Sequence, residues 1–415
     1  MKPLHLKGAA ALAAAALVGV GYQTAFGSES GPHRQSGSTS PAPASMAPSA
    51  QAPAAPKLKV SYWGKSLEAE LTDIAPVSAD EGWAVGTSRN DDGSGEAKQI
   101  LLHRKGKEWK PSPVPEGGEK TLLTRVDASG PDNVWVFGMK TAGEKPPVAF
   151  RWDGKQWHEM KVPVANDRWE GPRSTAVLAA DDVWLLGGER NAYHWDGRKW
   201  TKSQLPAVAM DIAGTGGRDV WAVGLRDTGD DDGGGPMSQP SAMHWDGKKW
   251  KTAETPEYHF PDPPAEEASS LDAVVAVSEN EVWALGRHDY NHGEGGPEPE
   301  DEVILLRWDG NAWKEAPEKA AKKAEMLASD GDGGLMLDTD LHMTKDGALH
   351  KIAKAEPVPG RSGKVEPVDK KQGFVNDKAV LVPGTRQVWC GGTITLGSHG
   401  DANFRRAGVV SYDAG

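Results

Sequence analysis

The fold of this chain is decided by two short stretches, Asp219–Gly224 (DVWAVG) and His244–Trp250 (HWDGKKW). The first is a short apolar run of the kind that forms a buried β-strand. In the second, Asp246-Gly247 separates two runs that each carry tryptophan. This is a hairpin signal, because the tight turn needs a positive φ that glycine adopts freely. Together the two stretches predict consecutive antiparallel strands.

Related stretches recur along the chain, and they contain nearly all of its 17 tryptophans. A repeat has four expected strands: a small apolar inner strand such as Ala273–Val277, then three strands that each carry a tryptophan. The second-strand tryptophans are Trp83, Trp135, Trp184, Trp221, Trp283 and Trp389; the third-strand ones are Trp152, Trp195, Trp245 and Trp308; the fourth-strand ones are Trp109, Trp157, Trp200, Trp250 and Trp313. Such self-similarity indicates a repeat architecture, with indoles supplying much of the core.

One repeat is degenerate. The interval between Trp283 and Trp389 is about twice the usual one, so a repeat without the tryptophan strand is expected between them. Gly334–Leu337 takes the place of that strand, Asp346-Gly347 keeps the turn, and His350 stands where the outer tryptophan is expected. The repeats then number seven.

The two ends of the repeat region complement each other. Val409–Asp413 is a third strand with no fourth strand after it, and Lys59–Trp63 is a strand with no partner strands before it. We therefore expect the N-terminal strand to complete the last blade. The prediction is an all-β, seven-bladed β-propeller of four-stranded antiparallel blades, whose closure protects the sheet edges.

The first residues predict export. Lys2 and Lys7 precede the apolar run Gly8–Gly21, and Ala25-Phe26-Gly27 is a candidate cleavage site, so residues 1–27 are expected to be a signal peptide. The alternative is a leader retained as an anchor. Residues 28–57 are rich in Ser, Pro and Ala and predict a disordered linker, which leaves residues 58–415 as the propeller domain. We expect a secreted protein of the bacterial cell envelope, with a loose association with the cell surface as a further expectation.

The charge and the cysteine content limit the classes of partner that this protein can bind. The formal net charge of −12 disfavours nucleic acid and anionic membranes. Cys390 is the single cysteine, so an internal disulfide is impossible. We interpret it as a small buried residue, with pairing between molecules as the alternative. A monomer is expected.

At this point the chain resembles the kelch and galactose-oxidase-like propellers. Leu185–Gly188 (LLGG), Tyr193–Asp196 (YHWD) and Trp200 follow the order of a kelch blade, and a period of about 51 residues fits the kelch repeat. Most blades depart from it by having one glycine rather than two. The oxidase copper site needs two tyrosines, two histidines and a cross-linked cysteine. No residues here match that set, so the resemblance implies the fold and not the oxidase activity.

Strand direction places all the long connections on one face, which we call the long-loop face. It carries the connections from second to third strands and those between blades. Binding residues concentrate on long loops held by a rigid scaffold. Arg168 and Trp169 in the connection 165–173, and Tyr258, His259 and Phe260 in the connection 253–269, are the ligand-binding candidates. The alternative is that Trp169 plugs the channel and that Tyr258 and Phe260 only anchor their loop.

Metal binding is a further expectation. His288, Asp289 and His292 could hold zinc or copper, with a plain polar loop as the alternative. Asp227–Gly235 and Asn90–Glu96 resemble calcium-binding loops loosely, with solvated acidic loops as the alternative. Otherwise no cofactor is expected.

The sequence thus predicts a secreted propeller that binds a protein or glycan partner through its long-loop face without catalysis. The alternative is an extracellular carbohydrate-active or metal-dependent enzyme of the galactose-oxidase-like class. Phosphate-loop, nucleophile-elbow and zincin motifs are absent from the sequence, so no catalytic residue is assigned.

Overall fold

The computed structural model describes residues 56–140, 148–163, 172–229, 237–260, 266–290, 300–397 and 403–414. The predicted signal peptide and nearly all of the predicted linker lie outside these ranges. The described residues belong to one compact unit, Ala54–Gly415. None of the helices described is long and apolar enough to span a membrane.

The described strands form seven groups of four, which we call blades 1 to 7. Blades 1 to 4 are β2 (Ala69–Ser78), β3 (Glu81–Ser88), β4 (Lys98–Lys105) and β5 (Glu108–Pro111); β6 (Thr121–Gly130), β7 (Asn133–Lys140), β8 (Val148–Trp152) and β9 (Trp157–Lys161); β10 (Pro172–Ala179), β11 (Asp182–Gly187), β12 (Asn191–Trp195) and β13 (Trp200–Gln204); and β14 (Val208–Gly216), β15 (Asp219–Asp227), β16 (Ser238–Trp245) and β17 (Trp250–Ala253).

Blades 5 to 7 are β18 (Ala268–Ser278), β19 (Glu281–Asp289), β20 (Glu302–Trp308) and β21 (Trp313–Glu315); β22 (Ala328–Ser329), β23 (Leu335–Asp338), β24 (Leu341–Met343) and β25 (Leu349–Lys351); and β26 (Gly373–Leu381), β27 (Gln387–Leu396), β28 (Phe404–Asp413) and β1 (Lys59–Trp63). A short helix α1 (Glu318–Ala321) and a 3₁₀ turn η1 (Pro367–Lys371) lie in connections. Blades 4 and 5 are joined by one parallel pair, Ser238 with Ala268.

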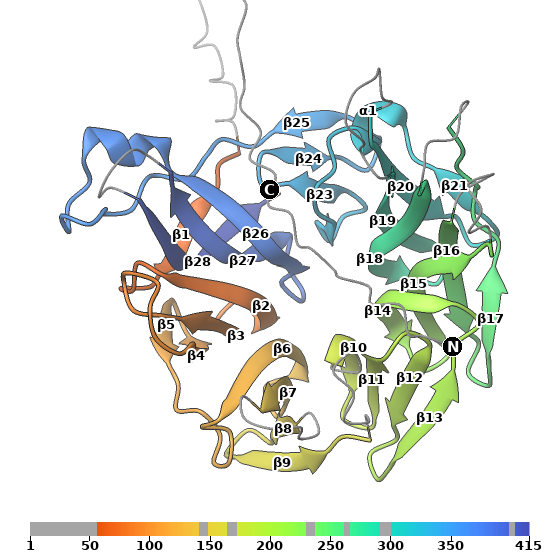
Figure 1. Ribbon diagram of the computed structural model, residues 1–415, viewed down its shortest axis with the longest axis horizontal. Coiled ribbons are helices and arrows are strands. Elements are labelled where there is room, and N and C mark those ends of the chain that lie inside the picture. The colour runs from red at the N-terminus through yellow and green to blue at the C-terminus, as the bar shows by residue number, and fades with distance from the viewer. Residues whose placement is uncertain are drawn as a thin grey trace, which may run out of the picture. The chain divides into compact units, whose positions relative to one another are not determined.

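The blades are arranged in a ring. The first strand of each blade contacts the first strand of the next, from β2 through β6, β10, β14, β18 and β22 to β26, which returns to β2 (Figure 1). Within each blade, neighbouring strands pair antiparallel. The prediction of an all-β propeller is therefore confirmed.

The repeated tryptophans pack between blades. Trp221 of blade 4 lies 4.9 Å from Trp308 and 5.2 Å from Trp313 of blade 5, measured between ring centroids. Trp83, Trp135 and Trp184 pack in the same way on the third- and fourth-strand tryptophans of the blade that follows. Each of these four repeats thus presents one indole to the pair on its neighbour, which explains why the spacing recurs.

The second-strand indoles other than Trp83 each donate a hydrogen bond to a polar residue two positions before them. In blade 4, Asp219 Oδ1 accepts hydrogen bonds from Trp221 Nε1 (3.2 Å) and from His244 Nε2 (2.8 Å), and the imidazole stacks on Trp221. Asp182, Trp184 and His194 repeat this arrangement in blade 3. The histidine of the His-Trp-Asp-Gly stretch is therefore part of the blade's packing.

Closure by the N-terminal strand is confirmed, because β1 pairs antiparallel with β28. The expectation that Trp63 fills the fourth-strand tryptophan position of the last blade is wrong, however. The pairing of Lys59 with Ser411 sets a register in which Trp63 lies opposite Gly408 and away from the third-strand Tyr412, and the side chain of Trp63 is 44% exposed. Leu58 is buried beside Tyr412 in the core cluster instead. The linker residue Lys57 also pairs with Ala353 of blade 6.

Blade 6 is the degenerate repeat, and its strands are only two to four residues long. The outer tryptophan position was misplaced by one residue. Met343 pairs with Leu349 as Trp245 pairs with Trp250, so Leu349 rather than His350 occupies it. The turn between these residues, 344–348, is one residue longer than the turn 246–249. His350 is exposed as a result.

Candidate functional site

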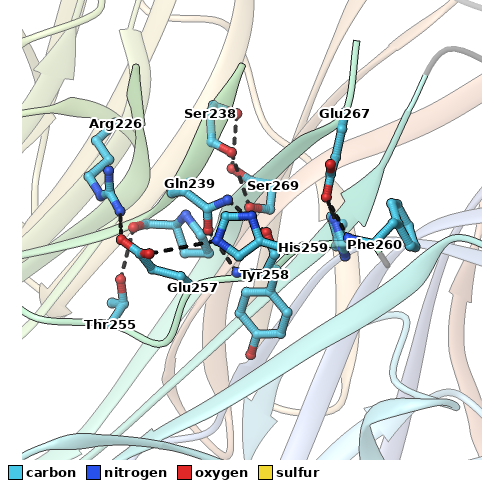
Figure 2. Close-up of polar contacts among 12 residues, drawn as sticks. Arg226, Ser238, Gln239, Thr255, Glu257, Tyr258, His259, Phe260, Glu267 and Ser269 are labelled. Atoms are coloured by element: carbon cyan, nitrogen blue, oxygen red, sulfur yellow. Dashed lines mark hydrogen bonds and ion pairs between the residues drawn. The ribbon is translucent and has the colours of Figure 1, made fainter. Parts of the chain in front are cut away.

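The long-loop face is built unevenly, because blades 4 and 5 extend further toward it than the repeat predicts. β15 continues to Asp227, β18 begins at Ala268 and β19 continues to Asp289. These extensions convert part of the predicted loops 225–240, 253–269 and 287–301 into sheet. The connection from β17 to β18 crosses this raised region, and it carries the candidates Tyr258, His259 and Phe260 (Figure 2).

Tyr258 is held along β16 by a side-chain amide. Its backbone N–H donates to Gln239 Oε1 (2.8 Å), and Gln239 Nε2 donates to its carbonyl (2.7 Å). The ring packs on the core cluster of blades 4 and 5, which includes Trp308. Burial, and then the charge of Glu315 and a hydrogen bond with it, raise the pKa of the phenol. Tyr258 therefore anchors its own connection.

Phe260 is buried as well, and it covers a histidine. Its ring stacks on His288 with centroids 3.9 Å apart and an interplanar angle of 15°. Its backbone N–H donates to Glu267 Oε1 (2.8 Å). The interpretation of Tyr258 and Phe260 as anchors, rather than as exposed contacts for a partner, matches this packing.

His288 lies between two carboxylates. Its Nε2 is 2.7 Å from Glu267 Oε1 and its Nδ1 is 2.9 Å from Glu302 Oε2. His288 and Glu267 have no exposed side-chain surface, whereas Glu302 is 56% exposed. A neutral imidazole donates from one nitrogen only, so both contacts are hydrogen bonds only if the ring carries two protons or one carboxyl is protonated.

The described candidate metal ligands around His288 do not converge on one metal position. The two carboxylates contact opposite nitrogens of His288, so one ion cannot bind all three groups together. Asp289 is half-buried, and burial raises the pKa of its carboxyl. No set of three or more His, Cys, Asp or Glu side chains within the described ranges could hold a metal. His292 lies outside these ranges, so a metal at His288 and His292 stays a prediction.

The calcium-like loop 90–96 uses its oxygens internally. Asp91 Oδ1 accepts from the backbone N–H of Leu67 (2.9 Å), and Asp92 Oδ1 accepts from that of Ser94 (2.9 Å). Hydrogen bonds from Ser94 lower the pKa of Asp92. Residues 230–236 of the other calcium-like loop are not described, so calcium binding also stays a prediction.

His259 is the exposed member of the candidate connection. Its Nε2 lies 3.7 Å from Glu257 Oε2, and Glu257 also pairs with Arg226 of β15 (Figure 2). All three side chains are about 40% to 57% exposed, so this group of polar side chains is accessible to a partner. Arg168 and Trp169 lie outside the described residues.

Sequence reasoning missed the large apolar side chains that the surface exposes. They are Trp63 (44%), Met139 (45%), Met237 (45%), Val365 (50%) and Val375 (54%). All except Trp63 lie in connections or strand ends on the long-loop face. Met139 is second to last in β7, Met237 immediately precedes β16, and Val375 is near the start of β26. No pattern marks Met139 and Val375, because each stands in a stretch that also satisfies the strand repeat.

A second group that was missed lies on the inner strands. Asp73, Asp127 and Asp211 each accept a hydrogen bond from a backbone N–H of a later blade, at Val126 (3.0 Å), Val177 (2.8 Å) and Val274 (2.9 Å) respectively. Their charges, that of Asp211 most, raise the pKa of the Lys378 ammonium on β26. The contacts make this group a connection between blades. A recurring Asp beside Ile or Ala in the inner strands (LTDIA at 71–75, MDIAG at 210–214) was the available signal.

Comparison with known proteins supports the fold. No family model and no curated protein matches this sequence. Among solved structures, the chain is similar to YCF48 bound to a D1 peptide, with 12% identity over 86% of this chain and 97% of that chain and a TM-score of 0.51. The β-propeller domain of the Trilobed protease from Pyrococcus furiosus gives 11% identity, 85% and 95% coverage and a TM-score of 0.49. The polysaccharide lyase Uly1 gives 9% identity over 88% of this chain and 94% of that chain, with a TM-score of 0.49. At these identities the likeness concerns the fold alone.

Proposed function

We propose that this protein is an exported, non-catalytic propeller that binds a protein partner through its long-loop face. The export and the envelope location rest on the leader-like residues 1–27. A closer relation to the kelch propellers rests on the blade sequence LLGG at 185–188 followed by YHWD at 193–196. The partner class rests on the chemistry of the face itself.

The observation that carries the proposal is the set of exposed apolar side chains on that face. Met139, Met237 and Val375 are each about half exposed, although their backbones are fixed by the sheet or next to it. Met237 N–H, for example, donates to the carbonyl of Glu267 (2.7 Å). Apolar groups on a rigid frame lose little conformational entropy when a partner buries them, and methionine adapts to varied shapes.

A polar group accompanies these side chains. The polar side chains of Arg226, Glu257 and His259 are exposed on the raised region of blades 4 and 5. Apolar contacts with charged residues around them are typical of protein interfaces rather than of glycan sites. The YCF48 structure, which has the same fold, is bound to a peptide, and we take this as support for a protein partner.

The test is a binding experiment with matched surface variants of the full chain. The triple variant Met139→Asp, Met237→Asp, Val375→Asp should lose capture of partners from cell-envelope and culture fractions, while Trp63→Asp, which changes the exposed tryptophan on the outer strand β1, should retain it. Circular dichroism and thermal unfolding check that both variants fold. Capture that persists in the triple variant, or binding to a glycan array alone, would contradict a protein interface on this face.

The metal-dependent alternative has its own assay. One equivalent of copper or zinc on the purified protein, lost in His288→Ala/His292→Ala, would favour an enzyme over a binding protein. The contacts of both His288 nitrogens with carboxylates give no support to this alternative.

A further inference from the structure

A crevice lies between blades 4 and 5, at the ends of the strands that carry the short turns. Its volume is about 360 Å³. It is lined by Trp221, His244, Lys251, Thr252, Ala253, Glu254, Trp308, Asn311 and Ala312. These residues come from β15, β16, β17 and the start of the connection that follows it, β20, and the β20–β21 turn. None of them is among the side chains on which the function proposed above rests, so the crevice does not depend on that function.

The crevice is bordered by a turn in which the sequence of blade 5 differs from that of blades 2 to 4. After Trp-Asp-Gly, the turn continues with Lys155-Gln156 in blade 2, Arg198-Lys199 in blade 3 and Lys248-Lys249 in blade 4. In blade 5 the same two positions hold Asn311-Ala312, and both line the crevice. Shorter side chains at a repeated position leave space that the other blades give to long ones. This departure of blade 5 from the repeat thus falls on two residues that border the crevice.

The lining combines an aromatic wall with free polar groups. Trp308 is partly exposed beside the buried Trp221. His244 is bound to Asp219 through Nε2, and its Nδ1 has no hydrogen-bond partner among the described residues. The side chains of Glu254 and Asn311 are exposed and have no partner within the described part of the chain. An indole surface with imidazole, carboxylate and amide groups around it suits a ring that has an apolar face and hydroxyls at its edge.

We propose that this crevice binds a single neutral pyranose sugar. Its volume lies at the lower end of the range of small-molecule sites, about 300–1,000 Å³, as a single ring requires. The Trp308 indole would lie against the C–H face of the sugar. Glu254, Asn311 and the His244 Nδ1 would take its hydroxyls, since these planar side chains can each accept a hydrogen bond from a hydroxyl.

The charges of the lining disfavour anionic ligands. The Lys251 ammonium is paired with Asp246 Oδ2 (2.5 Å), so Glu254 is the unpaired charge of the lining, and it repels phosphates, sulfates and carboxylates. Trp221 is only 1% exposed and leaves Trp308 as the indole within reach, so the lining does not form the aromatic cage that typically binds quaternary ammonium ligands.

The experiment uses the full chain and a panel of methyl pyranosides of glucose, galactose, mannose and fucose, with saturation-transfer NMR and titration. We expect one glycoside to bind at a single site. Asn311→Lys/Ala312→Lys, which restores the Lys-Lys pair of blade 4, should weaken it by at least about 10-fold, and Glu254→Ala, at an exposed position, should weaken it by about as much. Arg198→Asn/Lys199→Ala, the reverse change in the turn of blade 3, should leave the affinity within about twofold.

Three results would overturn the proposal. The first is that none of the glycosides binds at millimolar concentration. The second is binding that Asn311→Lys/Ala312→Lys leaves unchanged while that variant unfolds like the parent protein. The third is binding of tetramethylammonium or inorganic phosphate in place of every glycoside, because that would assign the crevice to an ion.

Discussion

At the scale of single residues, the tryptophans divide by burial rather than by their place in the repeat. Trp221 is 1% exposed and touches Trp308, Trp313 and His244, whereas Trp63 is 44% exposed on the edge of β1. The sequence predicted the first correctly, because its neighbours repeat with it. It misplaced the second, because the spacing of the tryptophans does not give the register in which β1 pairs with β28.

Truncation of these two indoles should therefore have different costs. Trp221→Ala removes a side chain packed against two indoles of the next blade, and we expect it to lower the free energy of unfolding by about 3–5 kcal/mol. Trp63→Ala should cost less than about 1 kcal/mol, because 44% of the Trp63 surface stays exposed and the side chain fills no core position. Equilibrium denaturation of both variants measures the difference. Equal losses would contradict the packing described for Trp221.

The inner-strand carboxylates give a pH dependence. Burial raises the pKa of Asp127 to about 7 from an ordinary value of 3.8, although two backbone N–H groups oppose the shift. Because the folded state binds this proton more tightly than the unfolded state, the contribution of Asp127 to stability is greatest at acid pH. It is lost as the pH rises from about 4 to about 7.

Asp127→Asn removes that titration. We expect the parent protein to lose up to about 2 kcal/mol more than the variant when the pH rises from 5 to 8, as measured by urea unfolding at each pH. Because the parent protein and the variant are compared at the same two pH values, the contributions of the other titrating groups to the pH dependence cancel. A difference between parent and variant that is the same at both pH values would show that Asp127 does not titrate in this range.

At the scale of elements, the closing strand was predictable and its details were not. The last repeat lacks a fourth strand and the chain begins with a strand that has no blade of its own, so the second must complete the first. This argument concerns topology and holds for any register of the pair. Which side chain fills the core depends on the register, and there Leu58 replaces the expected aromatic. The strand extensions of blades 4 and 5 escaped prediction for a related reason: polar residues such as Gln239 and Glu267 bond inside the fold.

Deletion of the closing strand tests its contribution. Removal of residues 1–64 takes away β1 and Leu58, leaves the edge of β28 unpaired and should lower the melting temperature by at least about 10 °C. Removal of residues 1–55 leaves the pairs of Lys57 and β1 intact and should change it little. Thermal unfolding of the two truncated chains measures the effect. Similar melting temperatures for both would mean that β1 contributes little to closure.

At the scale of the whole molecule, the contacts between neighbouring blades differ in strength around the ring. Side-chain hydrogen bonds connect inner strands from β2 to β18, through Asp73, Asp127, Asp211 and Ser174, whose hydroxyl donates to Asp211 Oδ1 (2.5 Å). Within the described residues β22 makes no such bond to β18 or β26. Blade 6 also has the shortest strands, and Met336 takes the position of the second-strand tryptophan.

This asymmetry predicts where the ring opens first. Amide hydrogens in regular structure exchange through local or sub-global opening, and the least strongly packed unit opens with the lowest free energy. We expect residues 326–352 of blade 6 to lose protection before residues 219–227 of β15, although both lie in paired strands, because blade 6 lacks both the indole contacts and the inner-strand carboxylates. Hydrogen exchange followed by mass spectrometry resolves the two segments. In Trp221→Ala the order should reverse or the gap should narrow, since that variant weakens the contact between blades 4 and 5. Equal protection of the two segments in the parent protein would mean that backbone pairing alone, and not the packing between blades, sets the stability of the ring.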